Sequence, residues 1–173
     1  MTLDDEALRR AETLITELEN QTDRGAAIIG VAWVEEALQA AIESVLESDK
    51  KTWDRLFGRS GPLSSLSAKI DLARLLNICS KVIAKDLHLL REIRNDFAHT
   101  IAAKDHTGLT FKSTHIADKC FTIKCIAHEA LSEPRHAFVR ACAILNSDLY
   151  IHRFFRERIT SRETIHARSE TDA

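Results

Sequence analysis

One run of uncharged, almost entirely apolar residues constrains the fold of this chain more than any other feature. Residues 26–34 read Ala-Ala-Ile-Ile-Gly-Val-Ala-Trp-Val. The run lies inside a longer helical pattern, which we expect to begin near Asp23 and to end at about Ser48. A helix that is apolar all round must be covered by other elements on most of its sides. The run therefore predicts a buried helix.

Apolar residues also recur with the period of an α-helix along most of the remaining chain. A loop is expected at residues 57–63, which hold two of the five glycines and one of the two prolines. So few glycines and prolines argue against a sheet protein rich in tight turns. We expect an all-α, single-domain bundle of about six helices in residues 1–160 and a polar, flexible tail at residues 161–173. The helices are expected over residues 4–20, 23–48, 65–78, 84–100, 115–131 and 134–158.

Charge is distributed unevenly, although the formal net charge is only −2. Residues 1–50 hold 4 Lys and Arg against 12 Asp and Glu, whereas residues 51–134 hold 13 against 9 and residues 135–173 hold 7 against 5. The asymmetry favours packing of acidic on basic segments within one chain or between two copies, and it also allows a basic surface for an acidic partner. A domain that grips duplex DNA alone usually carries a strong basic excess, which is missing here.

Cysteine usage and the chain start suggest a reduced, cytoplasmic protein. None of the four cysteines forms a Cys-x-x-Cys pair, and all lie among apolar residues, as is typical of free buried thiols. The first residues, Met-Thr-Leu-Asp-Asp-Glu, do not resemble a signal peptide. We expect no membrane-spanning run of the required ~18–20 apolar residues.

No metal or cofactor site is expected. His115, Cys120 and Cys125 are close in sequence, but successive members lie about 140° apart around a helix and do not converge. Phosphate-binding, nucleophile-elbow and zinc-protease motifs do not occur.

The predicted helix over residues 84–100 carries the most informative polar residues. Its core face leaves Arg94 between two leucines, where an unpaired guanidinium would be costly. We therefore expect a carboxylate partner for Arg94. Glu35 and Asp71 are the candidates because each interrupts an apolar face, and we prefer Glu35.

Asn95 and His99 are four residues apart and share the polar face of the same helix, so they can contact one substrate or each other. Arg94 and His99 do not meet within one helix, so joint action would need a second helix or a second subunit. Alternatively, His99 is a solvated residue or a cation favoured by the helix C-terminus.

Three separated segments resemble the mannitol operon repressor (MtlR) family. They are residues 57–76 (FGRSGPLSSLSAKIDLARLL), residues 23–25 (DRG) and residues 86–99 (DLHLLREIRN followed by FAH). The resemblance covers roughly residues 5–155. It implies an all-α, dimer-forming protein that acts in bacterial transcriptional regulation through another regulator, without its own DNA-reading module. No helix-turn-helix signature is found in this sequence, which agrees.

A shorter segment, residues 94–99, is similar to the R-x4-H motif of HEPN-type ribonucleases. That resemblance implies a metal-independent endoribonuclease in which Arg94 and His99 meet at a dimer interface. His99 would then be the general acid or base, Arg94 would stabilise the phosphorane charge and Asn95 would orient one of them. The main hypothesis is nevertheless a non-enzymatic regulator that forms a homodimer and binds another protein, and the alternative is the ribonuclease with RNA as its partner.

The last predicted helix ends in a basic and aromatic segment, with Arg153 and Arg156 beside Phe154 and Phe155. We prefer an interpretation in which the two rings close the bundle and the arginines complement the helix end and the acidic first helix. The alternative is contact with nucleic acid or an acidic protein surface.

Overall fold

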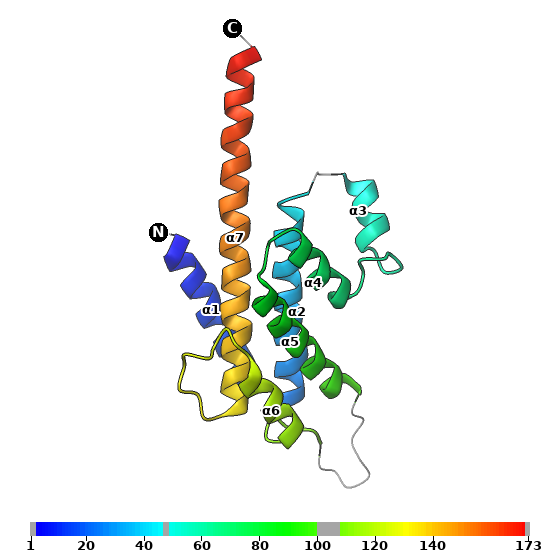
Figure 1. Cartoon of the computed structure of the whole chain (residues 1–173). Helices are drawn as coiled ribbons and strands as arrows, with labels where there is room; N and C mark the ends of the chain where they lie inside the picture. The colour runs from blue at the N-terminus through cyan, green and yellow to red at the C-terminus, as the bar shows by residue number, and fades with distance from the viewer. Residues whose placement is uncertain (1–2, 47–48, 100–107, 172–173) are drawn as a thin grey trace.

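The computed structural model describes residues 3–46, 49–99 and 108–171, and this part of the chain is an all-α single domain without strands, as expected. The helices occur in the order α1 (Leu3–Glu19), α2 (Asp23–Glu43), α3 (Lys50–Phe57), α4 (Leu66–Leu75), α5 (Lys81–His99), α6 (Thr114–Thr122) and α7 (Pro134–Thr171). Helix α7 packs along α1 and α2, and its C-terminal part extends beyond the other helices (Figure 1).

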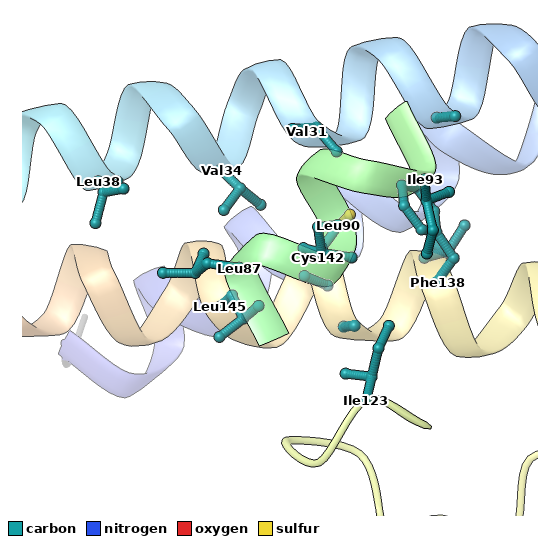
Figure 2. Packing of buried hydrophobic residues seen from close by; sticks show 14 of the residues in the cluster. Val31, Val34, Leu38, Leu87, Leu90, Ile93, Ile123, Phe138, Cys142 and Leu145 are labelled. Atoms are coloured by element: carbon teal, nitrogen blue, oxygen red, sulfur yellow. The ribbon is translucent and has the colours of Figure 1, made fainter. Parts of the chain in front are cut away.

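Helix α2 is the buried helix that the apolar run predicts. The Thr22 side chain caps its start by accepting a hydrogen bond from the Gly25 N–H. Four helices pack against it: α1, α4, α5 and α7. Side chains from α2, α5 and α7 gather between these helices (Figure 2), among them Val31, Val34 and Leu38 of α2, Leu87, Leu90 and Ile93 of α5, and Phe138, Cys142 and Leu145 of α7.

Gly30 lets α1 and α7 approach α2 closely. A methyl group at this position would lie 3.0 Å from a Leu18 methyl carbon, 3.1 Å from the Cys142 sulfur and 3.3 Å from the Phe138 ring. The missing side chain therefore sets the spacing of three helices.

The composition of α2 also corrects one expectation. By length and apolar content α2 meets the criterion for a membrane span, although we expected no such run. Eight of its residues are buried by neighbouring helices, which accounts for its apolar character as a core helix.

Several helix boundaries differ from expectation, and the largest differences concern α3, α6 and α7. Helix α3 was not predicted; Asp49 caps it, and its Trp53 and Phe57 rings stack with centroids 3.9 Å apart. Helix α6 ends at Thr122 rather than near residue 131. Helix α7 begins at Pro134 as expected but continues past residue 158 to Thr171.

A buried carboxylate explains the early end of α6. Asp86 on α5 is 1% exposed, and its two oxygens accept hydrogen bonds from the backbone N–H groups of Lys124 (2.9 Å) and Cys125 (2.8 Å). A longer α6 would need those N–H groups for its own carbonyls. The hydrogen bonds to Asp86 thus replace the intrahelical hydrogen bonds that would have continued α6 into residues 123–131.

Candidate functional site

The polar residues predicted on α5 lie at the surface or are half-buried. His99 is exposed at the last position of α5, and Asn95 is half-buried. Arg94 is half-buried, and its Nε is enclosed without a hydrogen-bond partner. None of the three lines the cavity described below.

The two carboxylates proposed as partners of Arg94 pair with other cations. Lys69 of α4 donates a hydrogen bond of 2.7 Å to Glu35, and its side chain is only 8% exposed. His88 lies 3.5 Å from Asp71. Among the described residues no ion pair joins Arg94 to Glu35 or Asp71. Glu35 therefore joins α2 to α4 and not, as we expected, to α5.

Two of the three segments that resemble the MtlR family, residues 23–25 and 86–99, meet at one end of the bundle. Asp23 forms an ion pair with Arg135 of α7 and accepts a hydrogen bond of 3.0 Å from the Phe111 N–H. The Arg135 guanidinium also donates to backbone carbonyls at the end of α1. Arg24 donates to the Ala98 carbonyl in the last turn of α5 at 3.2 Å. These residues connect α1, α2, α5 and α7, so their geometry indicates a structural role.

The cysteines are unsuited to nucleophilic chemistry. All four are free thiols, and three of them are buried. Burial raises the pKa of Cys120 and of Cys125 to about 12, and it raises the pKa of Cys142 well above its usual value. A protonated thiol is neither a nucleophile nor a good metal ligand. Within the described residues no cluster of three potential metal ligands occurs.

A groove between α1, α2 and α7 is a concave site that the sequence analysis did not identify. Its enclosed part is a cavity of about 240 Å³. It opens along α1 into a wider hollow that shares Arg10, Trp33 and Asn146 with it. The cavity is lined by Arg10, Trp33, Glu36, Ala37, Ala40, Asn146, Tyr150 and Arg153.

Side chains in this groove hold one another in place. Asn146 is 6% exposed, and its Nδ2 donates a hydrogen bond of 3.0 Å to the Trp33 carbonyl. The Arg10 guanidinium carbon lies 4.4 Å from the centroid of the Tyr150 ring, which is a cation–π contact. A hydrogen bond to the Glu6 carboxylate is the main cause that raises the pKa of Tyr150. The groove therefore combines two aromatic side chains, a buried amide and guanidinium groups.

One signal in the sequence pointed to this groove. Asn146 follows five apolar residues in the middle of a core-facing helix, where an amide needs hydrogen-bond partners, and Tyr150 follows it by one turn. The contribution of Arg10 depends on how α1 packs, which the pattern along α7 does not contain.

The aromatic pair of α7 lies near the surface. The Phe154 and Phe155 rings contact each other edge to face, with centroids 6.2 Å apart, and Phe155 is 53% exposed. Arg156 is exposed next to them. Phe155 therefore does not close the bundle, contrary to the preferred interpretation of the sequence.

Comparison with known proteins identifies the fold. No family model and no curated protein sequence match this chain. Among solved structures, a chain of the X-ray structure of the MtlR-HPr complex from Escherichia coli is similar, with a TM-score of 0.67 and 19% sequence identity. The match covers 82% of this chain and 98% of that chain. The chain thus has the fold of MtlR, in agreement with the resemblance of its three sequence segments.

Proposed function

With the MtlR fold as the starting point, we propose that this protein is a non-enzymatic regulator of bacterial transcription that acts by binding another protein. The observation that supports this most directly is the fold match, because the similar protein is itself in a complex with a protein partner, HPr. The match spans nearly all of that chain, so the likeness is not limited to one shared helical motif. A net charge of −2 argues against DNA binding as the main activity.

The surface of α7 around the exposed Phe155 is the proposed contact surface for the partner. Aromatic side chains and arginines are enriched where proteins bind each other. A partner that covers a half-exposed phenylalanine removes apolar surface from water, which favours binding. Phe155 and Arg156 place both residue types side by side on a helix that extends beyond the bundle (Figure 1). We propose that an HPr-like protein docks there.

Isothermal titration calorimetry with E. coli HPr tests this proposal. Binding by the wild type is expected, and Phe155→Ser is expected to weaken it about tenfold because a central aromatic contact is lost. Leu75→Ser is the matched control, since Leu75 is 80% exposed on α4. Failure of the wild type to bind would refute an HPr-like partner, and equal weakening by both variants would refute the α7 surface. A gel shift with operator DNA is expected to show no binding by this protein alone.

We also propose a cytoplasmic homodimer. The uneven charge supports it, because the acidic first 50 residues of one copy can pair with the basic remainder of another. Sedimentation equilibrium is expected to give twice the chain mass at low salt and a weaker association at high salt. A monomer at all salt concentrations would contradict the dimer.

One observation keeps the ribonuclease as a second candidate. The Nε of Arg94 is enclosed without a hydrogen-bond partner, as is the Nε of Arg91, although buried polar groups normally have one. The residue as a whole is only half-buried, and in this alternative the accessible part of its guanidinium would contact substrate RNA. In this alternative His99 is the general acid or base and Asn95 orients the reacting groups. Purified wild type incubated with total RNA in the presence of a chelator would degrade it, whereas His99→Ala would not. Intact RNA with both proteins rejects this candidate.

A further inference from the structure

The groove between α1, α2 and α7 has no part in the proposed partner contact, which lies further along α7. We propose that this groove is a binding site for a small anion that carries a planar ring, with a nucleoside monophosphate as its representative. The inference rests on the juxtaposition of Trp33, Tyr150, Asn146 and Arg10 in one concave site.

The aromatic lining accounts for the planar ring. Trp33 from α2 and Tyr150 from α7 both line the enclosed cavity. Flat ring systems stack on such side chains because the stacked faces leave water without losing hydrogen bonds. The cavity of about 240 Å³ holds a ring and part of a sugar, and the wider hollow along α1 receives the rest.

Asn146 accounts for recognition of the ring edge. Its Nδ2 uses one hydrogen on the Trp33 carbonyl, and its Oδ1 accepts no hydrogen bond within the described part of the chain. The remaining N–H and the oxygen form an adjacent donor and acceptor, the pattern with which an asparagine amide pairs with a nucleobase. Because the side chain is 6% exposed and fixed by its bond to α2, the amide is held ready for a ligand.

Arg10 accounts for the negative charge. Its guanidinium lies over the Tyr150 ring, which leaves the N–H groups at its edge for a phosphate or carboxylate. Arg153 lines the same cavity from α7. Two carboxylates also belong to the groove: Glu6 lines the wider hollow, and Glu36 lines the cavity and is exposed. We assign the anion to Arg10 because its guanidinium is held above the Tyr150 ring, beside the aromatic lining.

Tryptophan fluorescence provides a local readout. The chain has two tryptophans, so Trp53→Phe leaves Trp33 as the only reporter, and Trp53 lies outside the groove on α3. Titration with AMP is expected to quench Trp33. Adenosine and inorganic phosphate are each expected to bind at least about tenfold more weakly than AMP. Adenosine lacks the negatively charged group that contacts Arg10, and phosphate lacks the planar ring. UMP and nicotinate serve as further planar anions.

Arg10→Gln in the same background tests the assignment of the charge. We expect it to weaken AMP binding about tenfold. Arg59→Gln, which changes an exposed arginine in the loop after α3, is expected to leave binding unchanged. Circular dichroism verifies that each variant is folded.

Several outcomes would overturn the proposal. It fails if none of AMP, UMP and nicotinate changes Trp33 fluorescence at millimolar concentration, or if Arg59→Gln weakens binding as much as Arg10→Gln. It also fails if phosphate alone binds as tightly as AMP, or if Arg10→Gln dissociates a homodimer, since the groove would then be a subunit interface. HPr takes no part in the experiment, so its result is independent of the proposed regulatory function.

Discussion

Replacing Asp86 by asparagine is expected to destabilise the protein far more than an ordinary isosteric substitution. The Asp86 carboxylate is almost completely buried and accepts two backbone hydrogen bonds, from Lys124 at 2.9 Å and from Cys125 at 2.8 Å. An asparagine keeps one acceptor oxygen but turns an NH2 group toward the second backbone N–H. One charge-assisted hydrogen bond is lost, and a buried donor is left facing another donor.

The magnitude follows from these two changes. A hydrogen bond to a charged group contributes about 1.5–3 kcal/mol, and an unsatisfied buried donor costs about 1–3 kcal/mol. Because the two terms overlap, we expect a loss of about 3 kcal/mol in the free energy of unfolding. For a domain of this size each kcal/mol lowers Tm by about 2–4 °C, so Tm should fall by about 6–12 °C.

Thermal and urea unfolding followed by far-ultraviolet circular dichroism measures the effect. Asp71→Asn is the control, because the Asp71 side chain is 72% exposed and its contact with His88 is an exposed pair that contributes about 0–1 kcal/mol. If Asp86→Asn shifts the unfolding midpoint no more than Asp71→Asn does, the two hydrogen bonds do not hold residues 123–131 against α5.

Three further predictions concern the core, the thiols and the surface of α7. Gly30→Val should lower stability by about 1–3 kcal/mol in urea unfolding, because the added carbons would meet side chains of two neighbouring helices, α1 and α7, at close range; unchanged stability would show that these helices move apart freely. The free energy of unfolding should fall as the pH rises above 9. In the folded protein the pKa of Cys120 and of Cys125 is raised to about 12 from an ordinary value of 9.0. Between pH 9 and 12 only the unfolded chain therefore loses these protons, which favours unfolding. A double Cys→Ser variant that retains the full decline would contradict this assignment. Phe155→Ser should change the free energy of unfolding by less than about 0.5 kcal/mol, whereas Phe138→Ala, which removes a fully buried ring, should cost about 3–5 kcal/mol; similar losses in the two variants would mean that Phe155 is buried in solution.

Much of the fold followed from local patterns. The apolar run at residues 26–34 predicted a buried helix, and the helices expected from residue 65 and from residue 134 agree with the starts of α4 at Leu66 and of α7 at Pro134. These features depend on residues within a few positions of one another, because periodicity and capping are local. The early end of α6 could not be read in this way, since it depends on a carboxylate 38 positions before Lys124.

In the candidate sites, too, local sequence predicted some features, whereas others depend on how the helices pack. The side-chain period placed Arg94 beside the core and Asn95 on the polar face, and in the structure both are half-buried. The partner of Glu35 was not predictable in the same way, because α2 turns this carboxylate toward Lys69 of α4. The choice between two cations depends on the rotation and spacing of whole helices, and those are set by packing in the core.

We could infer an all-α domain, the buried second helix and the likeness of three segments to the MtlR family from local patterns, because helical period, caps and motif letters are properties of short stretches of chain. The shared groove of Arg10, Trp33 and Asn146 and the exposure of Phe155 could be found only from the packed helices. These residues come close or stay apart because of how α1, α2 and α7 pack, and that packing is the joint result of many side chains distributed over the whole chain.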